Sequence, residues 1–80
     1  MMVATKLKPI DHYLEKIQAR LHRKYPHLHF EVVRQDDREA FIHYTPFVEA
    51  EDWDIIKMSS GIATDAMVDA GYRIWVQPAA

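Results

Sequence analysis

The sequence predicts an α+β fold, a two-layer sandwich in which two helices cover one face of a three-stranded sheet in the order α-β-β-α-β. Three patterns indicate this: helical apolar spacing in residues 9–24 and 51–70, two alternating runs around a polar turn, and an alternating run after Gly71. Each predicted helix has one apolar stripe, and the predicted sheet has one clearly apolar face. We therefore expect both helices on that face of a single small domain spanning residues 1–80, with residues 1–8 as a flexible lead.

The first helix is predicted to begin at Pro9, because proline suits the first helical turn. Apolar side chains then recur at steps of three and four residues, as on one face of a helix. They are Ile10, Tyr13, Leu14, Ile17 and Leu21. The pair Tyr25-Pro26 should end the helix, because the residue before a proline avoids helical backbone angles.

Residues 28–34 (LHFEVVR) and 39–45 (EAFIHYT) read as the two strands of a hairpin. A three-residue loop, 36–38, sorts their side chains into an apolar and a mixed face better than a two-residue loop does. A slip of one residue exchanges the two faces, so the buried side selects the register. The expected apolar face carries Leu28, Phe30, Val32, Ala40, Ile42 and Tyr44.

The second helix and last strand, residues 51–77, are the stretch around which the chain is organised. Acidic residues crowd the first helical turn, where the exposed N–H groups favour negative charge, and Gly71 can adopt the left-handed conformation that ends a helix. Gly61, after two serines, weakens the middle of this helix. The pattern favours a glycine that the helix tolerates, and a bend or a break into two helices is the alternative. The expected buried stripe is Ile55, Ile56, Ile62, Ala63, Ala66, Met67 and Ala70.

The last strand, residues 72–77, alternates apolar and polar side chains and ends at Pro78. It can pair with either strand of the hairpin. We expect it beside the first strand, which gives the strand order 2-1-3. If the second and last strands are parallel within one sheet, the helix between them should form a right-handed crossover.

Composition narrows the functional classes. The chain has no cysteine, so disulfides and thiolate metal sites are excluded, and dimerisation is the expected supplement to a small core. A net charge of −2 with mixed signs argues against broad nucleic-acid binding. No apolar run has membrane-spanning length, and the first residues lack a signal-peptide core, so we expect a cytoplasmic protein without a membrane partner.

The sheet face without helices is the predicted interaction surface. Large apolar side chains on an uncovered face indicate a binding site, and aromatic residues with arginine are typical of interface anchors. The apolar members are Val33, Phe41 and Trp75, framed by His29, Glu31, His43 and Arg73. The alternative is that the faces are exchanged, or that one end of the chain covers this patch.

The histidines give a weaker alternative, a metal or small-ligand site. His27, His29 and His43 share one face in the expected register, with Glu31 directly opposite His43. Zinc accepts three histidines with a carboxylate or water. No established ligand spacing is present, however, and histidine is also an ordinary surface residue.

Two further functions are tested against the same residues. Exposed aromatics resemble in kind the platforms that stack single-stranded bases, but Glu31 and Glu39 lie beside Arg73 where a basic groove is required. For catalysis, Asp52 and Asp54 have a metal-ligand spacing, but residues two apart on a helix do not face each other. No catalytic motif or glycine-rich phosphate loop is present.

The sequence therefore predicts a non-enzymatic interaction module without a cofactor. It would bind a protein partner, or its own copy as a homodimer, through the exposed aromatic sheet face. The histidine site on the hairpin, possible also in a small enzyme, and single-stranded nucleic-acid binding remain the alternatives.

Overall fold

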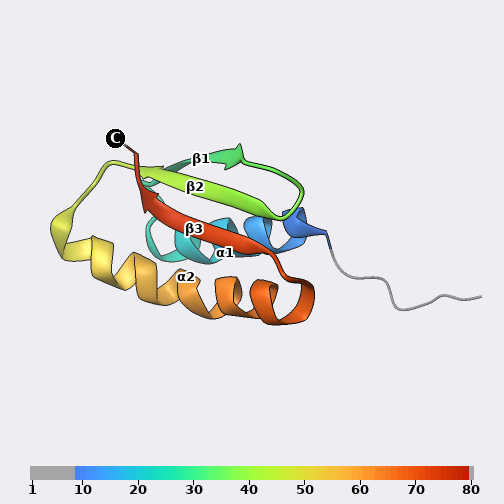
Figure 1. Cartoon of the computed structure of the whole chain (residues 1–80). Coiled ribbons are helices and arrows are strands. Elements are labelled where there is room, and N and C mark those ends of the chain that lie inside the picture. The colour runs from blue at the N-terminus through green and yellow to red at the C-terminus, as the bar shows by residue number, and fades with distance from the viewer. Residues whose placement is uncertain (1–8, 80) are drawn as a thin grey trace, which may run out of the picture.

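A computed structural model describes residues 9–79 and has two helices and a three-stranded mixed sheet in the predicted order. The predicted flexible lead, residues 1–8, lies outside the described residues. Figure 1 shows both helices on one side of the sheet, which confirms the predicted α+β class and its two layers. The elements are α1 (Ile10–Lys24), β1 (His29–Arg34), β2 (Glu39–Thr45), α2 (Glu49–Ala70) and β3 (Arg73–Pro78).

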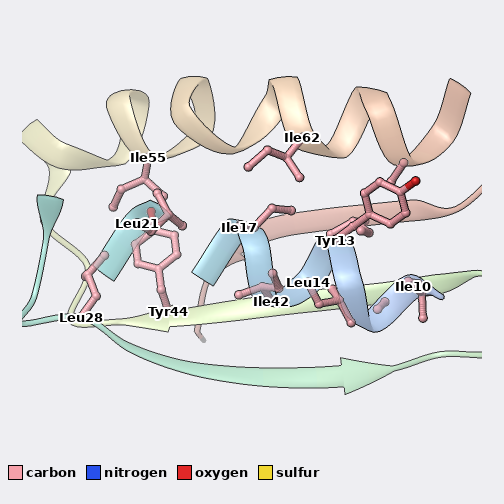
Figure 2. Packing of buried hydrophobic residues seen from close by; sticks show 13 residues of the cluster. Ile10, Tyr13, Leu14, Ile17, Leu21, Leu28, Ile42, Tyr44, Ile55 and Ile62 are labelled. Carbon is pink, nitrogen blue, oxygen red and sulfur yellow. The ribbon is translucent and has the colours of Figure 1, made fainter. Parts of the chain in front are cut away.

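The core lies between the helices and the sheet, and α1 contributes its whole predicted stripe to it. Figure 2 shows Ile42 and Tyr44 of β2 on the same side as Ile17 and Leu21 of α1 and Ile55 of α2. These five side chains have no exposed surface, so the helical and strand periodicities converge on one apolar layer. Helix α1 begins at Ile10, one residue after the predicted start, and ends before Tyr25, as the sequence predicts.

The hairpin has the predicted register. Val32 pairs with Ile42 and Phe30 with Tyr44, which leaves residues 36–38 as a three-residue loop. The backbone N–H of Gln35 bonds to the carbonyl oxygen of Glu39 at 2.9 Å and closes this loop. The Thr45–Pro46 peptide bond after β2 is cis.

The predicted strand order 2-1-3 is wrong, because the sheet has the order β1-β2-β3. Strand β3 runs parallel to β2, so the unit β2-α2-β3 joins neighbouring strands. The physical reason is burial. The inward side chains of β2, Ala40, Ile42 and Tyr44, are completely buried, whereas Phe30 and Val32 of β1 are only partly buried. The strand with the most deeply buried inward face is the central one.

Helix α2 begins at Glu49, two residues before the predicted start, and continues unbroken past Gly61 to Ala70. Gly71 then has a φ of 74°, the left-handed conformation predicted for it. Two members of the predicted buried stripe are wrong: Ile56 is 38% exposed and Met67 is 52% exposed. The core instead takes Ser59, whose hydroxyl donates to the carbonyl oxygen of Ile55 at 3.0 Å and so remains satisfied when buried.

None of the helices in the described part of the chain is both long and apolar enough to cross a membrane.

Candidate interaction face

The sheet face turned away from the helices, here called the open face, carries an apolar row across all three strands. Val33 of β1 stands opposite Phe41 of β2, which in turn stands opposite Trp75 of β3. Val33 is 39% exposed, Trp75 is 48% exposed, and Phe41 is half-buried between them. Three large apolar side chains therefore form one continuous solvent-facing strip.

Polar side chains lie on both sides of the apolar row. On one side, Glu39 stands opposite Arg73, and the indole Nε1 of Trp75 donates to Oε2 of Glu39 at 2.9 Å. On the other side, Glu31, His43 and Gln77 form a second cross-strand row. Nε2 of Gln77 lies 3.1 Å from Nε2 of His43. These contacts hold the frame in place around the strip, because each one joins two strands.

The seven residues predicted for the interaction surface all lie on strands whose register places them on the open face. The structure brings Val33, Phe41 and Trp75 into one row, and puts Glu31 directly opposite His43. His29 stands opposite Thr45, farther along the same face. Gln77 was not among the predicted residues, although its alternation with Trp75 and Arg73 in the last strand places it on the same face.

The histidines of the alternative metal site do not converge. Nε2 of His27 lies 3.1 Å from Oε1 of Glu51 on α2, and His43 instead contacts Gln77. Within residues 9–79 there is no group of three or more histidine, aspartate or glutamate side chains that could hold a metal ion. The hairpin register alone suggested proximity, but the first turn of α2 provides His27 with a different neighbour.

The acidic residues at the start of α2 have structural partners in the helix layer. The hydroxyl of the buried Tyr44 donates to Asp52, and the hydroxyl of Tyr25 donates to Oδ2 of Asp54 at 2.5 Å. Nζ of Lys24 lies 2.7 Å from the same Asp54 oxygen. Burial is the main cause that raises the pKa of the Tyr44 hydroxyl above its ordinary value, and the hydrogen bond to Asp52 is the second cause. These contacts fasten the start of α2 to β2 and to the end of α1.

The cations of α1 lie in the helix layer, on the other side of the sheet from the apolar row. They border a shallow groove of 470 Å³ between α1 and α2, whose apolar wall includes Met58 and Ile62. The basic members are Lys16, Arg20, Arg23 and Lys24. A platform for single-stranded nucleic acid needs its cations beside its stacking aromatics, so this separation weighs against that alternative.

Comparisons with protein-family models, with curated proteins and with solved structures gave no match.

Proposed function

We propose that this chain is a non-enzymatic interaction module that binds a protein partner through its open face. Phe41 and Trp75 are the apolar anchors, and Val33 extends the strip to the third strand. His29, Glu31, His43 and Arg73 form the polar frame. The single observation that carries the proposal is the apolar row, which runs unbroken from β1 to β3 on a face that neither helix covers.

The chemistry of this face fits a protein surface. Protein interfaces combine an apolar centre with a polar rim, and tryptophan and arginine are enriched among the residues that contribute most to binding. Here the frame holds carboxylates, an arginine and histidines around three apolar side chains. The matching partner surface is an apolar ridge or strip with mixed charges at its borders.

The test is affinity capture from source-cell lysate on immobilised protein, comparing Trp75→Glu and Val33→Glu with the unaltered chain. Each variant places a carboxylate in the apolar row, at opposite edges of the sheet. We expect both to lose the same captured partner by at least tenfold, because an unpaired charge would be desolvated at the interface centre. Both positions are well exposed, so far-ultraviolet circular dichroism should remain that of the unaltered chain.

The matched control is Val68→Glu, which makes the same change at a side chain that is 76% exposed on α2, in the other layer. It should retain the partner. Equal capture by the two open-face variants and the control would contradict the proposal. Unfolding of Trp75→Glu would show instead that Trp75 belongs to the core.

A further inference from the structure

Helix α2 carries a second stripe of mainly apolar side chains, next to the stripe that enters the core. It consists of Trp53, Ile56, Ser60, Ala63 and Met67, here called the α2 seam. Its members recur at alternating steps of three and four residues, the pattern by which one helix packs along another. Trp53 is 70% exposed and Met67 is 52% exposed, whereas the core stripe of Ile55 and Ile62 faces α1 and the sheet. Ala63, between Ile56 and Met67, is half-buried and packs against the edge of the core, so the seam is open at its two ends, Trp53 and Met67.

The seam borders a groove that opens at the edge of the sheet. The groove lies between α2 and β3 and has a volume of 320 Å³. Ile56, Ala63 and Met67 line its helical side, and Ile74, Trp75 and Val76 line its strand side. An exposed helical stripe and an apolar groove are thus parts of one surface.

The outer edge of β3 belongs to the same surface. The backbone N–H of Arg73 donates to the carbonyl oxygen of Arg38, just before β2, at 2.7 Å. The backbone N–H of Ala79 donates to the carbonyl oxygen of Tyr44 in β2 at 2.9 Å. Because successive residues of a strand direct their backbone groups to opposite sides, those of Ile74 and Val76 point away from β2. β3 is the last strand of the sheet on that side, so this edge can accept another strand.

We infer that a second copy of this chain packs antiparallel along the α2 seam, with the two β3 edges side by side. The large side chains at the two ends of the seam, Trp53 and Met67, are equally far along the helix from Ser60. In an antiparallel pair centred on Ser60, Trp53 of each copy meets Met67 of the other, a favourable ring–sulfur contact. The small Ser60 and Ala63 near the centre let the two helices approach closely.

Charge supports the same orientation. Glu49 lies one turn before Trp53, at the acidic start of α2. The guanidinium of Arg38 is at the other end, where Nη1 is 3.9 Å from the position that a Cβ on Gly71 would occupy. Arg73 begins β3 beside it. The last turn of α2 itself has no basic residue and carries Asp69, so these cations come from the hairpin loop and from β3. An antiparallel copy brings the acidic start of each α2 near these two arginines, whereas a parallel copy would bring the acidic starts together.

The first experiment measures solution mass by light scattering after size-exclusion chromatography, at several concentrations. The unaltered chain should have about twice the 9.4 kDa mass of one chain. Met67→Glu, and independently Ser60→Arg, should give the mass of one chain, because each places a charge in the seam. Val68→Glu, one residue along the same helix but outside the seam, should remain a dimer.

A second experiment tests the antiparallel orientation with a short bis-maleimide. The chain has no cysteine, so single-cysteine variants react at one place only. A mixture of Trp53→Cys and Met67→Cys should yield cross-linked heterodimer, and neither variant alone should cross-link efficiently. Ser60→Cys alone should cross-link to itself, and Val68→Cys should not.

The outcomes separate this inference from the proposed function. A single-chain mass for the unaltered protein at every concentration would overturn the inference and leave partner binding at the open face intact. A dimer that persists in Met67→Glu and Ser60→Arg but dissociates in Val33→Glu would also overturn it, and would place the second copy on the open face. Val33 is used here because Trp75 borders both surfaces.

Discussion

At the scale of single residues, the two glycines of the chain have opposite conformational requirements. Gly61 lies inside α2, and a Cβ added there would meet no other atom within 4 Å. Glycine inside a helix is less favourable than alanine by about 1 kcal/mol, because it loses more backbone freedom on folding. We therefore expect Gly61→Ala to raise the free energy of unfolding by about 1 kcal/mol, measured by urea denaturation.

Gly71 provides the matched control. Its φ of 74° lies in the left-handed region, where a side chain costs roughly 1–2 kcal/mol. Gly71→Ala should therefore lower the free energy of unfolding, although the substitution is the same. A gain in stability at Gly71, or a loss at Gly61, would contradict these backbone assignments.

At the scale of elements, Asp54 links the start of α2 to Lys24 and Tyr25. These contacts predict that the free energy of unfolding falls at acidic pH. The hydrogen bond from Lys24, followed by that from Tyr25, holds the pKa of Asp54 below its ordinary value of 3.8. A carboxyl whose pKa is lower in the folded state contributes stability above its unfolded pKa, and loses it as the pH falls through the folded value. Unfolding by urea should therefore become easier below about pH 4.

Asp54→Asn tests this pH dependence of stability, because the amide keeps the shape of the side chain but does not titrate. The variant should be less stable than the unaltered chain at pH 7, and the difference should shrink as the pH falls to 3. Asp65→Asn, at an exposed position farther along the same helix, is the control for replacing an aspartate of α2 by asparagine. A difference for Asp54→Asn that is constant from pH 7 to pH 3 would show that the ionised carboxylate does not stabilise the fold. Since the Lys24–Asp54 pair is partly exposed, high salt should also reduce the difference.

Among the elements, the sequence pattern alone was sufficient to predict the hairpin. The hairpin register followed from the sequence, because only one register gathers Ala40, Ile42 and Tyr44 on a single face. Helix α2 was harder, because it has apolar side chains on two faces. Spacing alone placed Ile56 and Met67 with Ile55 and Ile62, whereas the structure divides them between the seam and the core. A buried serine, Ser59, lies in the core stripe because its hydroxyl bonds within the helix.

At the scale of the whole molecule, strand order could not be obtained from local pattern. The last strand has the same alternation whether it lies beside β1 or β2, and that choice depends on how α2 crosses the sheet. The open-face residues were nevertheless identified, because alternation assigns the face of a strand independently of its neighbour. The row from Val33 to Trp75 required the strand order as well, since Phe41 must lie between them.

Dimerisation along the α2 seam predicts how the thermal stability of the whole molecule depends on concentration. A domain of 80 residues buries a limited core, and a second copy adds buried apolar surface without any cysteine. Mass action then stabilises the folded dimer by about 1.4 kcal/mol for each tenfold rise in protein concentration. The melting temperature of the unaltered chain should rise by several degrees when the protein concentration is raised about a hundredfold, from 5 to 500 μM. Met67→Glu should melt at one temperature throughout that range, and Val68→Glu should follow the unaltered chain. A melting temperature independent of concentration in all three proteins would mean that the chain folds without its copy, and that the stability comes from the core between the helices and the sheet alone.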